Sequence, residues 1–405
     1  MKPRTDTPLF TTLLGAITAL AALSIDMSLP ALPAMTTALS AGRAAAQWTL
    51  SLFVLGFAGG QLFLGPLSDR IGRRPVLLCG LTGYVVTGIA CAMAPSIEIL
   101  VTMRFLQGLC ACAGAVIARA IIRDIFDRPT AAAKQSVLTV VTTLAMLIAP
   151  IVGAWVLGII GWRGVFALLP AAGTLILILS LVFIPETRPE MSEQRVGALH
   201  SYLLVLRQPV TVGNAFAAAF IFAGLFVFIA DSSTVFIRTL GISPQGFSWM
   251  FAIVAFGQLC GSTLNRMLAT RVSPVRLIRI GGGLTVMATL LIGLFAVWQV
   301  NIDALLLAMA LYAFALGMTN PNAIAAAMVP LPQYAGAASA IIGFLYFVMG
   351  SIGATLSGYI MPGTVAGMLG IIAGFGAAGI VVFVLLEIHQ ARQADQRVCT
   401  SELRG

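Results

Sequence analysis

Long uninterrupted apolar runs are the feature that most constrains this chain. A helical residue rises about 1.5 Å and the hydrocarbon core of a bilayer is about 30 Å thick, so a spanning helix needs about 20 mainly apolar residues. Twelve such runs follow one another, and we expect spans near 10–32, 47–68, 75–95, 97–122, 134–160, 164–185, 209–231, 246–269, 275–298, 304–328, 334–360 and 364–387. A transmembrane β-barrel would show alternating segments of about ten residues instead. The chain is therefore predicted to be an all-α polytopic membrane protein.

Composition excludes the soluble alternative. Only 9% of the 405 residues are charged and 59% are apolar, whereas about 25% of residues are charged in an ordinary soluble protein. The net charge of +9 would suit nucleic-acid binding, but the basic residues stand in short clusters between the apolar runs. Loops of membrane proteins carry such clusters. We therefore expect a lipid bilayer around the chain and no nucleic-acid partner.

The positions of Lys and Arg predict the orientation. If the N-terminus is inside, nineteen of the 23 basic residues fall in the termini and in one set of loops. The opposite loops hold only Arg43, Arg163 and Arg238, and Arg104 lies within the fourth expected span. Because the cytoplasmic loops carry the positive excess, both termini are predicted to be cytoplasmic, in a multi-pass protein of the cell inner membrane. The first run lacks a clean cleavage site and is expected to stay as the first helix.

The longest polar interruption lies at the midpoint of the chain and predicts its division. We expect an N-terminal six-helix bundle over 1–185, a cytoplasmic linker with a short interfacial helix over 186–208, a C-terminal six-helix bundle over 209–388 and a cytoplasmic tail over 389–405. An internal repeat supports two related halves. The pattern Gly-x-x-x-Asp-Arg from Gly65 recurs as Gly-x-x-x-Asn-Arg from Gly261, 196 residues later and after the second span of each half. Such repeats are a common build for transporters.

Four motifs carry a resemblance to a known family. The loop after the second span reads G-x-L-x-D-R-x-G-R-R from Gly65, and the fourth span contains R-x-x-Q-G from Arg104. The fifth span contains A-P-I-V-G-A from Ala149, similar to the antiporter motif G-P-x-x-G-G with Ala at two of its glycine positions, and the first span ends in D-M-S-L-P-A-L-P from Asp26. The chain resembles the drug/proton antiporters of the major facilitator superfamily over nearly its whole length, and among them the Bcr/CflA drug-resistance group. That resemblance implies two pseudo-symmetric six-helix bundles, and we expect a monomer.

Two ionisable residues lie inside the expected spans. Asp26 and Arg104 each cost about 2.5–3.5 kcal/mol to insert, which makes them functional candidates. Both are six or seven residues from the outer end of their helix, so we expect them to lie at the same depth and to meet. One interpretation is a structural ion pair. The other, favoured by the resemblance, is that Asp26 takes the proton or a substrate cation, that Arg104 tunes this binding, and that Gln107, one turn away, bonds Arg104 or the substrate.

The loop motif and the fifth span supply a candidate conformational gate. Arg73 is expected to pair with Asp69 or with Asp124, and such a cluster would hold the two halves together while the outer side is open. Pro150 and Gly153 should bend the fifth span, and by resemblance the bend helps to seal the cavity. Topological anchoring by charge and an ordinary packing kink are the respective alternatives. The predicted gate residues are Gly65, Asp69, Arg70, Gly72, Arg73, Arg74, Asp124, Pro150 and Gly153.

The second half carries almost no charge within its spans. Between Arg279 and Glu387 the only charged residue is Asp303, in an outer loop, while Asp231 near the outer end of the seventh span is expected to be hydrated. An apolar, aromatic wall with hydrogen-bonding groups suits lipophilic molecules better than multiply charged metabolites. Its candidate members, each of which is more often a packing residue when taken alone, are Asn214, Phe222, Tyr312, Asn320, Asn322 and Tyr346.

The function predicted from these features is proton-coupled export of small lipophilic or amphiphilic compounds, with Asp26, Arg104 and Gln107 also in the substrate site. The alternative is a proton-linked transporter of a single metabolite, such as an amino acid or a sugar. An enzyme would need clustered ligands or a nucleophile–base pair, which the sequence lacks, so we expect no catalytic residue, metal or cofactor. A G-x-x-x-x-G-K-[ST] nucleotide loop is absent, which disfavours ATP drive, and no repeated filter or charge ring indicates a channel.

Overall fold

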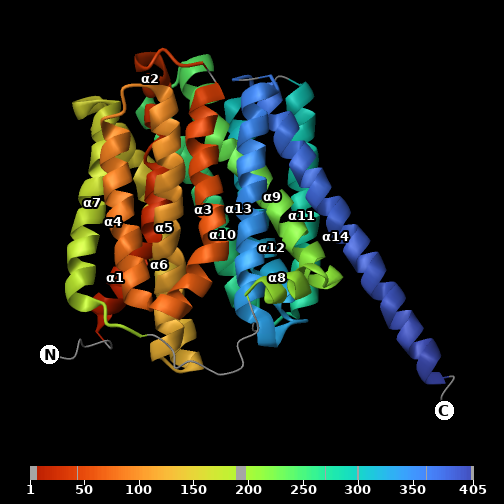
Figure 1. Cartoon of the computed structure of the whole chain (residues 1–405). Helices are drawn as coiled ribbons and strands as arrows, with labels where there is room; N and C mark the ends of the chain where they lie inside the picture. The colour runs from red at the N-terminus through yellow and green to blue at the C-terminus, as the bar shows by residue number, and fades with distance from the viewer. Residues whose placement is uncertain are drawn as a thin grey trace.

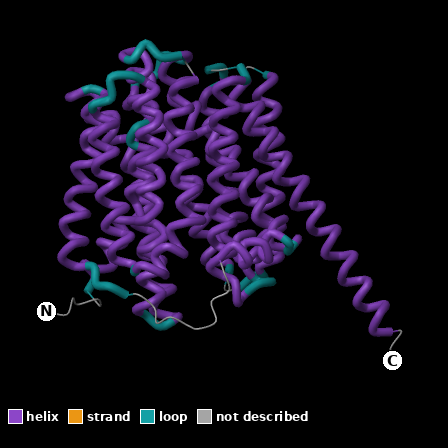
Figure 2. The backbone as a smooth tube through the Cα atoms, in the orientation of Figure 1, coloured by secondary structure: helices purple, strands orange, loops and turns teal. Residues whose placement is uncertain are grey.

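The fold is that of a computed structural model, which describes residues 7–42, 44–187, 198–269, 271–298, 301–361 and 363–402. Side chains are described within these ranges except at 46, 128, 274, 332 and 390–402. Long helices joined by short loops account for nearly all of this backbone (Figure 2). Twelve of the described helical segments are long and apolar enough to cross a bilayer. The predicted fold class and number of spans are thus confirmed.

The first half of the chain contributes six long helices and two short ones. They are α1 (Pro8–Asp26), η1 (Leu29–Ala31), α2 (Leu32–Ala38), α3 (Ala44–Ile71), α4 (Arg73–Ala92), α5 (Ile97–Ile125), α6 (Arg128–Ile160) and α7 (Trp162–Phe183). We call α1–α7 the N-terminal half. Its fifth span begins six residues earlier than expected, because hydropathy marks the hydrocarbon-spanning part while the helix continues into the polar region.

The second half follows the short linker helix α8 (Ala198–Leu206). Its elements are α9 (Pro209–Ser233), η2 (Thr234–Thr239), α10 (Pro244–Leu268), α11 (Pro274–Val297), α12 (Ile302–Met328), η3 (Pro332–Tyr334), α13 (Ala335–Tyr359) and α14 (Val365–Glu402). We call α9–α14 the C-terminal half. The bundle limits expected from the sequence stay predictions.

The two halves stand side by side, with α1 beginning and α14 ending on the same side of the molecule (Figure 1). Following the charge-based prediction, we call that side cytoplasmic and the opposite side outer. Across the interface α3 packs against α13 and α6 packs against α10. These four helices therefore position the two halves relative to each other.

Glycines allow the helices of the N-terminal half to approach closely. A Cβ atom built on Gly108 would overlap with the carbonyl oxygen of Phe53, and one built on Gly56 would overlap with that of Phe105. Only glycine fits at such backbone-to-backbone contacts. The small-residue face of α5 thus brings α3 within direct contact and fixes the depth of the polar residues between them.

Hydrogen bonds close the interface between the halves on the outer side. Four of them join Gln47 Nε2 to Asp231 Oδ1 (2.8 Å), Arg238 Nη2 to Thr37 Oγ1 (2.6 Å), Ser248 Oγ to Pro150 O (2.9 Å) and Ser351 Oγ to Ser51 O (2.8 Å). The donor and acceptor of each bond come from different halves. Opening the outer side would break them.

The cytoplasmic part of α6 is less covered. Ser136 and Thr139 are exposed and Thr143 is partly exposed, at helical spacing from Pro150, which contacts α10 farther out. The face of α6 that meets the C-terminal half near Pro150 therefore presents hydroxyl groups toward the cytoplasmic side. The structure represents a state that is closed on the outer side.

Candidate functional site

A buried arginine organises the centre of the N-terminal half. Arg104 on α5 has 0% of its surface exposed, and its Nη1 donates to Gln107 Oε1 at 2.8 Å. Its Nη2 donates to the carbonyl oxygen of Ser24 on α1 at 2.9 Å, and its Nε lies 3.5 Å from that of Thr49 on α3. The guanidinium carbon lies 4.3 Å from the ring centroid of Phe53. Carbonyl dipoles and an aromatic face thus stabilise the charge and tie three helices together.

A second contact extends this network to α4. The hydroxyl oxygens of Ser24 and Tyr84 are 2.7 Å apart, and both side chains are fully buried. Gln107 Nε2 is buried without a hydrogen-bond partner. The guanidinium of Arg104 thus has acceptors within the protein, whereas Gln107 Nε2 is a donor that an acceptor atom of a substrate could use.

Asp26 does not join this network, which corrects the expectation that it meets Arg104. The carboxyl group is 1% exposed, its Oδ2 has no hydrogen-bond partner, and the described residues contain no ion pair between the two side chains. The reason lies in helix geometry. Arg104 reaches the backbone of Ser24, and two residues farther along α1 a side chain points about 200° away, to the opposite face. Asp26 and Arg104 can therefore lie at a similar depth in the membrane while Asp26 is on the face of α1 that points away from Arg104.

The predicted antiporter segment of α6 lies directly behind Asp26. A Cβ atom built on Gly153 would overlap with the carbonyl oxygen of Met27, the residue that follows Asp26. One turn earlier, the carbonyl oxygen of Pro150 accepts a hydrogen bond from Ser248 on α10. This part of α6 therefore contacts both the end of α1 and the C-terminal half.

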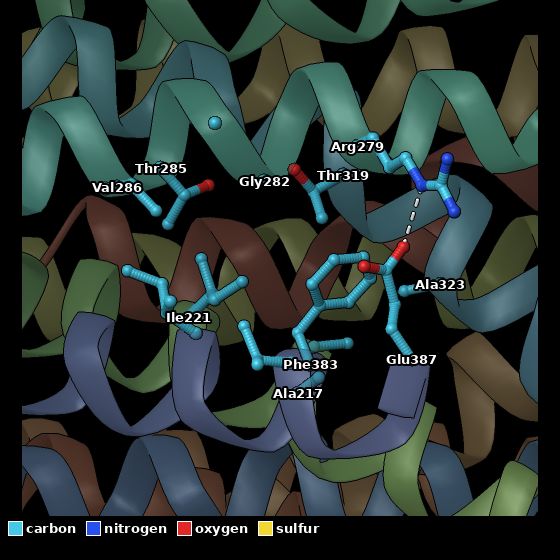
Figure 3. A pocket seen from close by; sticks show the side chains of 14 residues that line it. Ala217, Ile221, Arg279, Gly282, Thr285, Val286, Thr319, Ala323, Phe383 and Glu387 are labelled. Carbon is cyan, nitrogen blue, oxygen red and sulfur yellow. Dashed lines mark hydrogen bonds and ion pairs between the residues drawn. The ribbon is translucent and has the colours of Figure 1, made fainter. Parts of the chain in front are cut away.

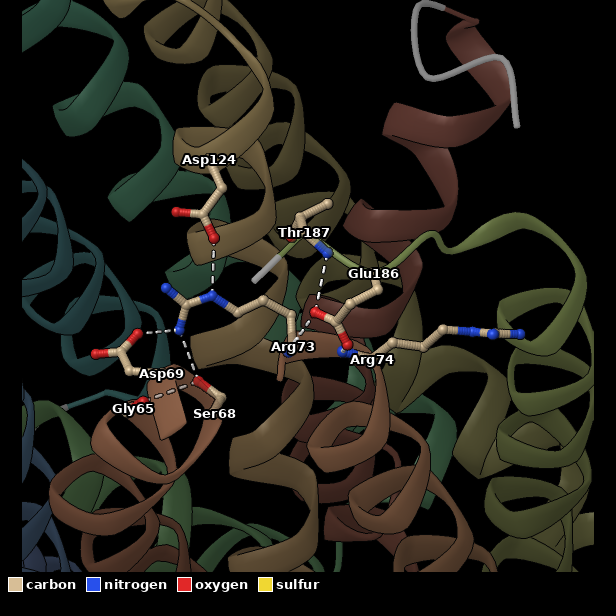
Figure 4. Close-up of polar contacts among 8 residues, drawn as sticks. All are labelled: Gly65, Ser68, Asp69, Arg73, Arg74, Asp124, Glu186 and Thr187. Atoms are coloured by element: carbon tan, nitrogen blue, oxygen red, sulfur yellow. Dashed lines mark hydrogen bonds and ion pairs between the residues drawn. The ribbon is translucent and has the colours of Figure 1, made fainter. Parts of the chain in front are cut away.

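The loop motif forms an ion-pair cluster around Arg73 (Figure 4). Arg73 is 2% exposed, its Nε donates to Asp124 Oδ2 at 2.8 Å, and its Nη1 contacts Asp69 and donates to Ser68 Oγ at 2.7 Å. Ser68 Oγ in turn donates to the carbonyl oxygen of Gly65 at 2.8 Å. Both partners expected for Arg73 bind it at the same time.

The position of this cluster corrects its expected role. Asp69, Arg73 and Asp124 belong to α3, α4 and α5, so their ion pairs lie within the N-terminal half and do not join the two halves. The physical cause is the turn at Gly72, whose φ of 119° folds α4 back along α3. Arg73 thereby points into its own half. Arg70 is exposed, and Arg74 Nη2 donates to Leu181 O at 2.7 Å, away from the cluster.

Glu186 is a member of this corner that the sequence analysis missed. Its Oε1 accepts from the backbone N–H of Arg73 at 2.8 Å and its Oε2 from that of Arg74 at 3.2 Å. A carboxylate at the first turn of α4 accepts hydrogen bonds from otherwise free backbone N–H groups, and the positive end of the helix dipole stabilises its charge. It also lies 2.6 Å from the Cβ position of Gly72, which leaves no room for a side chain there. No sequence motif indicated this contact, because Glu186 stands 113 residues from Arg73.

Three of the six candidates in the C-terminal half come together. The rings of Phe222 on α9 and Tyr346 on α13 are stacked, with centroids 3.8 Å apart and planes inclined by 19°. Asn320 on α12 donates from Nδ2 to the Tyr346 hydroxyl at 2.7 Å, and its Oδ1 has no partner. Phe222 and Tyr346 are both partly exposed. These residues can present aromatic surface and a free acceptor to a ligand.

The other three candidates hold internal hydrogen bonds. Tyr312, 0% exposed, donates its hydroxyl to Ile221 O at 2.9 Å. Asn214 donates to Val210 O at 2.9 Å within its own helix. Asn322 donates to Asn265 Oδ1 at 2.6 Å and to Met318 O at 2.9 Å. Their polar groups are used by the fold.

Phenylalanines that the sequence analysis did not select continue the aromatic surface across the interface. Phe347 on α13 lies 4.8 Å from the ring of Phe57 on α3 and 5.7 Å from that of Phe222, both edge to face. Phe226 packs against Phe222 at 5.6 Å. In an apolar span, ring spacing alone does not distinguish a ligand-facing aromatic from a packing one, so these residues carried no signal.

Asp231 differs from its expected hydrated state. It is 1% exposed and accepts a hydrogen bond from Gln47. The start of α3 packs against α9 at this level and covers the carboxyl group. The hydropathy pattern places the residue near the outer interface but contains no information about the neighbour that excludes water.

Two open pockets lie away from these residues. One of about 210 Å³ lies among α9, α11, α12 and α14, with glycine and phenylalanine walls and the Arg279–Glu387 ion pair (2.8 Å) at its edge (Figure 3). Another of about 360 Å³ lies between α4 and α7. Neither lining contains a predicted site residue. The candidate site is therefore defined by the polar and aromatic networks.

Comparisons with known proteins agree with this arrangement. Residues 14–354 match the family model described as Major Facilitator Superfamily. The chain is 29% identical over 374 residues to a bicyclomycin resistance protein homolog of Haemophilus influenzae, covering 91% of this chain and 94% of the relative. It is 29% identical over 335 residues to the multidrug transporter MdfA of Escherichia coli, covering 80% and 81%.

A solved structure shows the same fold. The crystal structure of a D-xylose-proton symporter superposes with a TM-score of 0.73 at 18% identity, covering 93% of this chain and 97% of the other. Together with the twelve spans and the family match over most of its length, this similarity identifies the chain as a member of the Major Facilitator Superfamily, a multi-pass membrane transporter of small molecules.

Proposed function

We propose that this protein exports small lipophilic or amphiphilic compounds in exchange for protons. The observation that carries the proposal is Asp26, a carboxyl group with 1% exposure and a free Oδ2 at the end of the first span. A buried carboxylate without a cationic partner must take up a proton or a ligand to stay buried. One oxygen atom thus serves either a proton or a hydrogen-bonding or cationic substrate, and this competition is what antiport requires.

Arg104 and Gln107 act beside Asp26 as positioning residues. They hold α1, α3 and α5 together, and the free Nε2 of Gln107 offers a donor to a substrate acceptor. A charge that is already satisfied by carbonyl groups does not compete with the proton at Asp26. The proton-binding carboxyl group of Asp26 is thereby kept apart from the structural guanidinium of Arg104.

The aromatic surface of Phe222, Tyr346 and Phe347 is the proposed substrate wall. It offers stacking area and the free Oδ1 of Asn320, without a fixed charge. Aromatic and apolar contacts tolerate ligands of differing shape. This favours lipophilic drugs over a single polar metabolite, in agreement with the resistance proteins that are similar to this chain.

The gate is proposed to act through the outer contacts. The Pro150–Gly153 segment touches Met27 beside Asp26 and Ser248 of the other half, so a change at Asp26 reaches the interface through adjacent atoms. The Arg73 cluster is proposed to keep the N-terminal half rigid during this motion. We further propose a monomer in the cell inner membrane, with both termini cytoplasmic, the bundle limits 1–185 and 209–388, and no nucleic-acid partner.

Reconstituted liposomes with an internal pH dye test this function. We expect lipophilic cations and neutral drugs to drive proton movement through the wild-type protein, which the internal dye reports as a pH change. Asp26→Asn should abolish uphill export while the protein remains folded. Asn keeps the shape but removes the titratable group. Uphill export at the full rate by Asp26→Asn would overturn the coupling assignment. A response confined to one amino acid or sugar across the panel would favour the single-metabolite alternative.

A further inference from the structure

Asp231 and Gln47 form an incomplete acid–amide pair across the two halves. Gln47 Nε2 on α3 donates to Asp231 Oδ1 on α9 at 2.8 Å, and both side chains are buried. The remaining atoms of the pair, Asp231 Oδ2 and Gln47 Oε1, have no hydrogen-bond partner. A carboxylate oxygen and an amide oxygen are both acceptors, so neither can satisfy the other.

A single proton on Asp231 would give both of these free atoms a hydrogen bond. A protonated Oδ2 is a donor, and Gln47 Oε1 is the free acceptor on the partner that already bonds Oδ1. The resulting pair has two parallel hydrogen bonds, Nε2–H to Oδ1 and Oδ2–H to Oε1. Unmade hydrogen bonds of buried groups are expensive, so the proton stabilises the closed contact.

We propose that Asp231 is a second proton-binding site and that its proton latches α9 to α3 on the outer side. The inference rests on the proposed function only in assuming that the outer side opens. The proton comes from the outer solution, binds Oδ2, and returns to water when the halves separate and the carboxylate becomes hydrated. It is therefore distinct from the proton exchanged at Asp26, and a lower outer pH favours closure.

Other charges near this pair do not replace the proton. Of the described charged groups on elements packed around the outer end of α9, Arg238 of η2 is exposed and donates to Thr37, and Asp303 of α12 is exposed. Asp26, beyond η1, carries the same sign as Asp231. No ion pair with Asp231 occurs in the described part of the chain, and Arg43 lies outside the described residues.

Spin labels on the outer surface test the latch. Met93 and Val297 lie at the outer ends of α4 and α11 and are 73% and 79% exposed, so cysteines there carry labels in a background without native cysteines. We measure their distance distribution in nanodiscs at low and high pH. The wild type should favour the short distance at low pH and gain a longer component at high pH, by about fivefold or more in population ratio.

Three variants separate the proton from the hydrogen bond. Asp231→Asn pairs with the Gln47 amide at any pH, so the short distance should dominate at both. Gln47→Leu removes the pair, so the long component should persist at both. Asp26→Asn should keep a shift that depends on Asp231, even if it abolishes transport.

Either of two results overturns the latch: an unchanged pH shift in Asp231→Asn, or a wild-type response in Gln47→Leu. A failure of proton-coupled export would be recorded separately in the liposome assay. It would leave these distances unaffected.

Discussion

The two halves link the ends of their second and fourth spans with different chemistry. After the second span of the N-terminal half, Asp69 and Asp124 bind Arg73 through ion pairs. At the repeated position of the C-terminal half, Asn265 accepts a neutral hydrogen bond from Asn322 on the fourth span of that half. The repeat preserves a link between the second and fourth spans and changes its charge. A link between these two spans is therefore common to both halves, whereas its charge is found only in the half that contains Asp26.

Removing the buried arginine is expected to have the largest effect. Arg104→Ala leaves Gln107 Oε1 and the carbonyl oxygen of Ser24 without the guanidinium donor and opens a cavity between three helices, so transport should fall to background. Arg104→Lys should recover only part of it, because Lys lacks the planar fork whose separate nitrogens reach Gln107 and Ser24. Drug transport into inverted vesicles provides the measurement.

The matched control is a neutral hydrogen bond in the C-terminal half. Tyr312→Phe removes one buried hydrogen bond to Ile221 and should lower transport by about threefold or less. Equal losses in Arg104→Ala and Tyr312→Phe, at equal protein levels, would contradict the greater weight given to the Arg104 network than to a single neutral hydrogen bond.

The next largest loss of transport is expected at the link between the second and fourth spans. Asp69→Asn removes one of the two anions that hold Arg73 and should lower transport of every substrate alike, by about tenfold, the equivalent of about 1.4 kcal/mol. Asn265→Ala should cost less, about threefold, because only a neutral bond is lost. The measurement is a transport panel with several drugs. A changed order of preference in Asp69→Asn would place Asp69 in the binding site instead.

Close packing at Gly153 provides a stability comparison within one helix. Gly153→Ala puts a methyl group onto the carbonyl oxygen of Met27 and should cost about 1–3 kcal/mol, visible as a lower Tm and a several-fold loss of transport. Gly158→Ala should be neutral, since its nearest neighbour, Gln245 Nε2, would be 3.8 Å away. Identical Tm values for the two variants would refute the close contact between α6 and the end of α1.

The smallest effect is expected at the aromatic wall. Tyr346→Phe keeps the stack on Phe222 but removes the acceptor for Asn320, so overall export should change by about twofold while the ranking of substrates shifts. Relative resistance to a set of drugs measures that ranking. A uniform reduction across the set would assign Tyr346 to packing alone.

The sequence predicted the parts of this molecule that depend on local properties. Hydropathy identified all twelve spans, because each must match the bilayer by itself. The motif after the second span also predicted both partners of Arg73, which lie on neighbouring helices.

Properties that depend on packing between distant segments were not predictable in the same way. Depth along a helix placed Asp26 and Arg104 together, but the rotation of α1 separates them. The covering of Asp231 by Gln47 joins residues 184 positions apart, and a single sequence does not record that proximity.

The linker helix has a mechanical consequence. α8 is a nine-residue rod, about 13 Å long, whose Tyr202 donates to Leu62 O of α3 at 2.7 Å while its Val205 packs with the buried Ala338 and Ile341 of α13. It is thus attached to both halves at their cytoplasmic ends. The distance through which those ends can travel during a transport cycle is limited by the length of this tether, so shortening or lengthening α8 would set the stroke of the transporter.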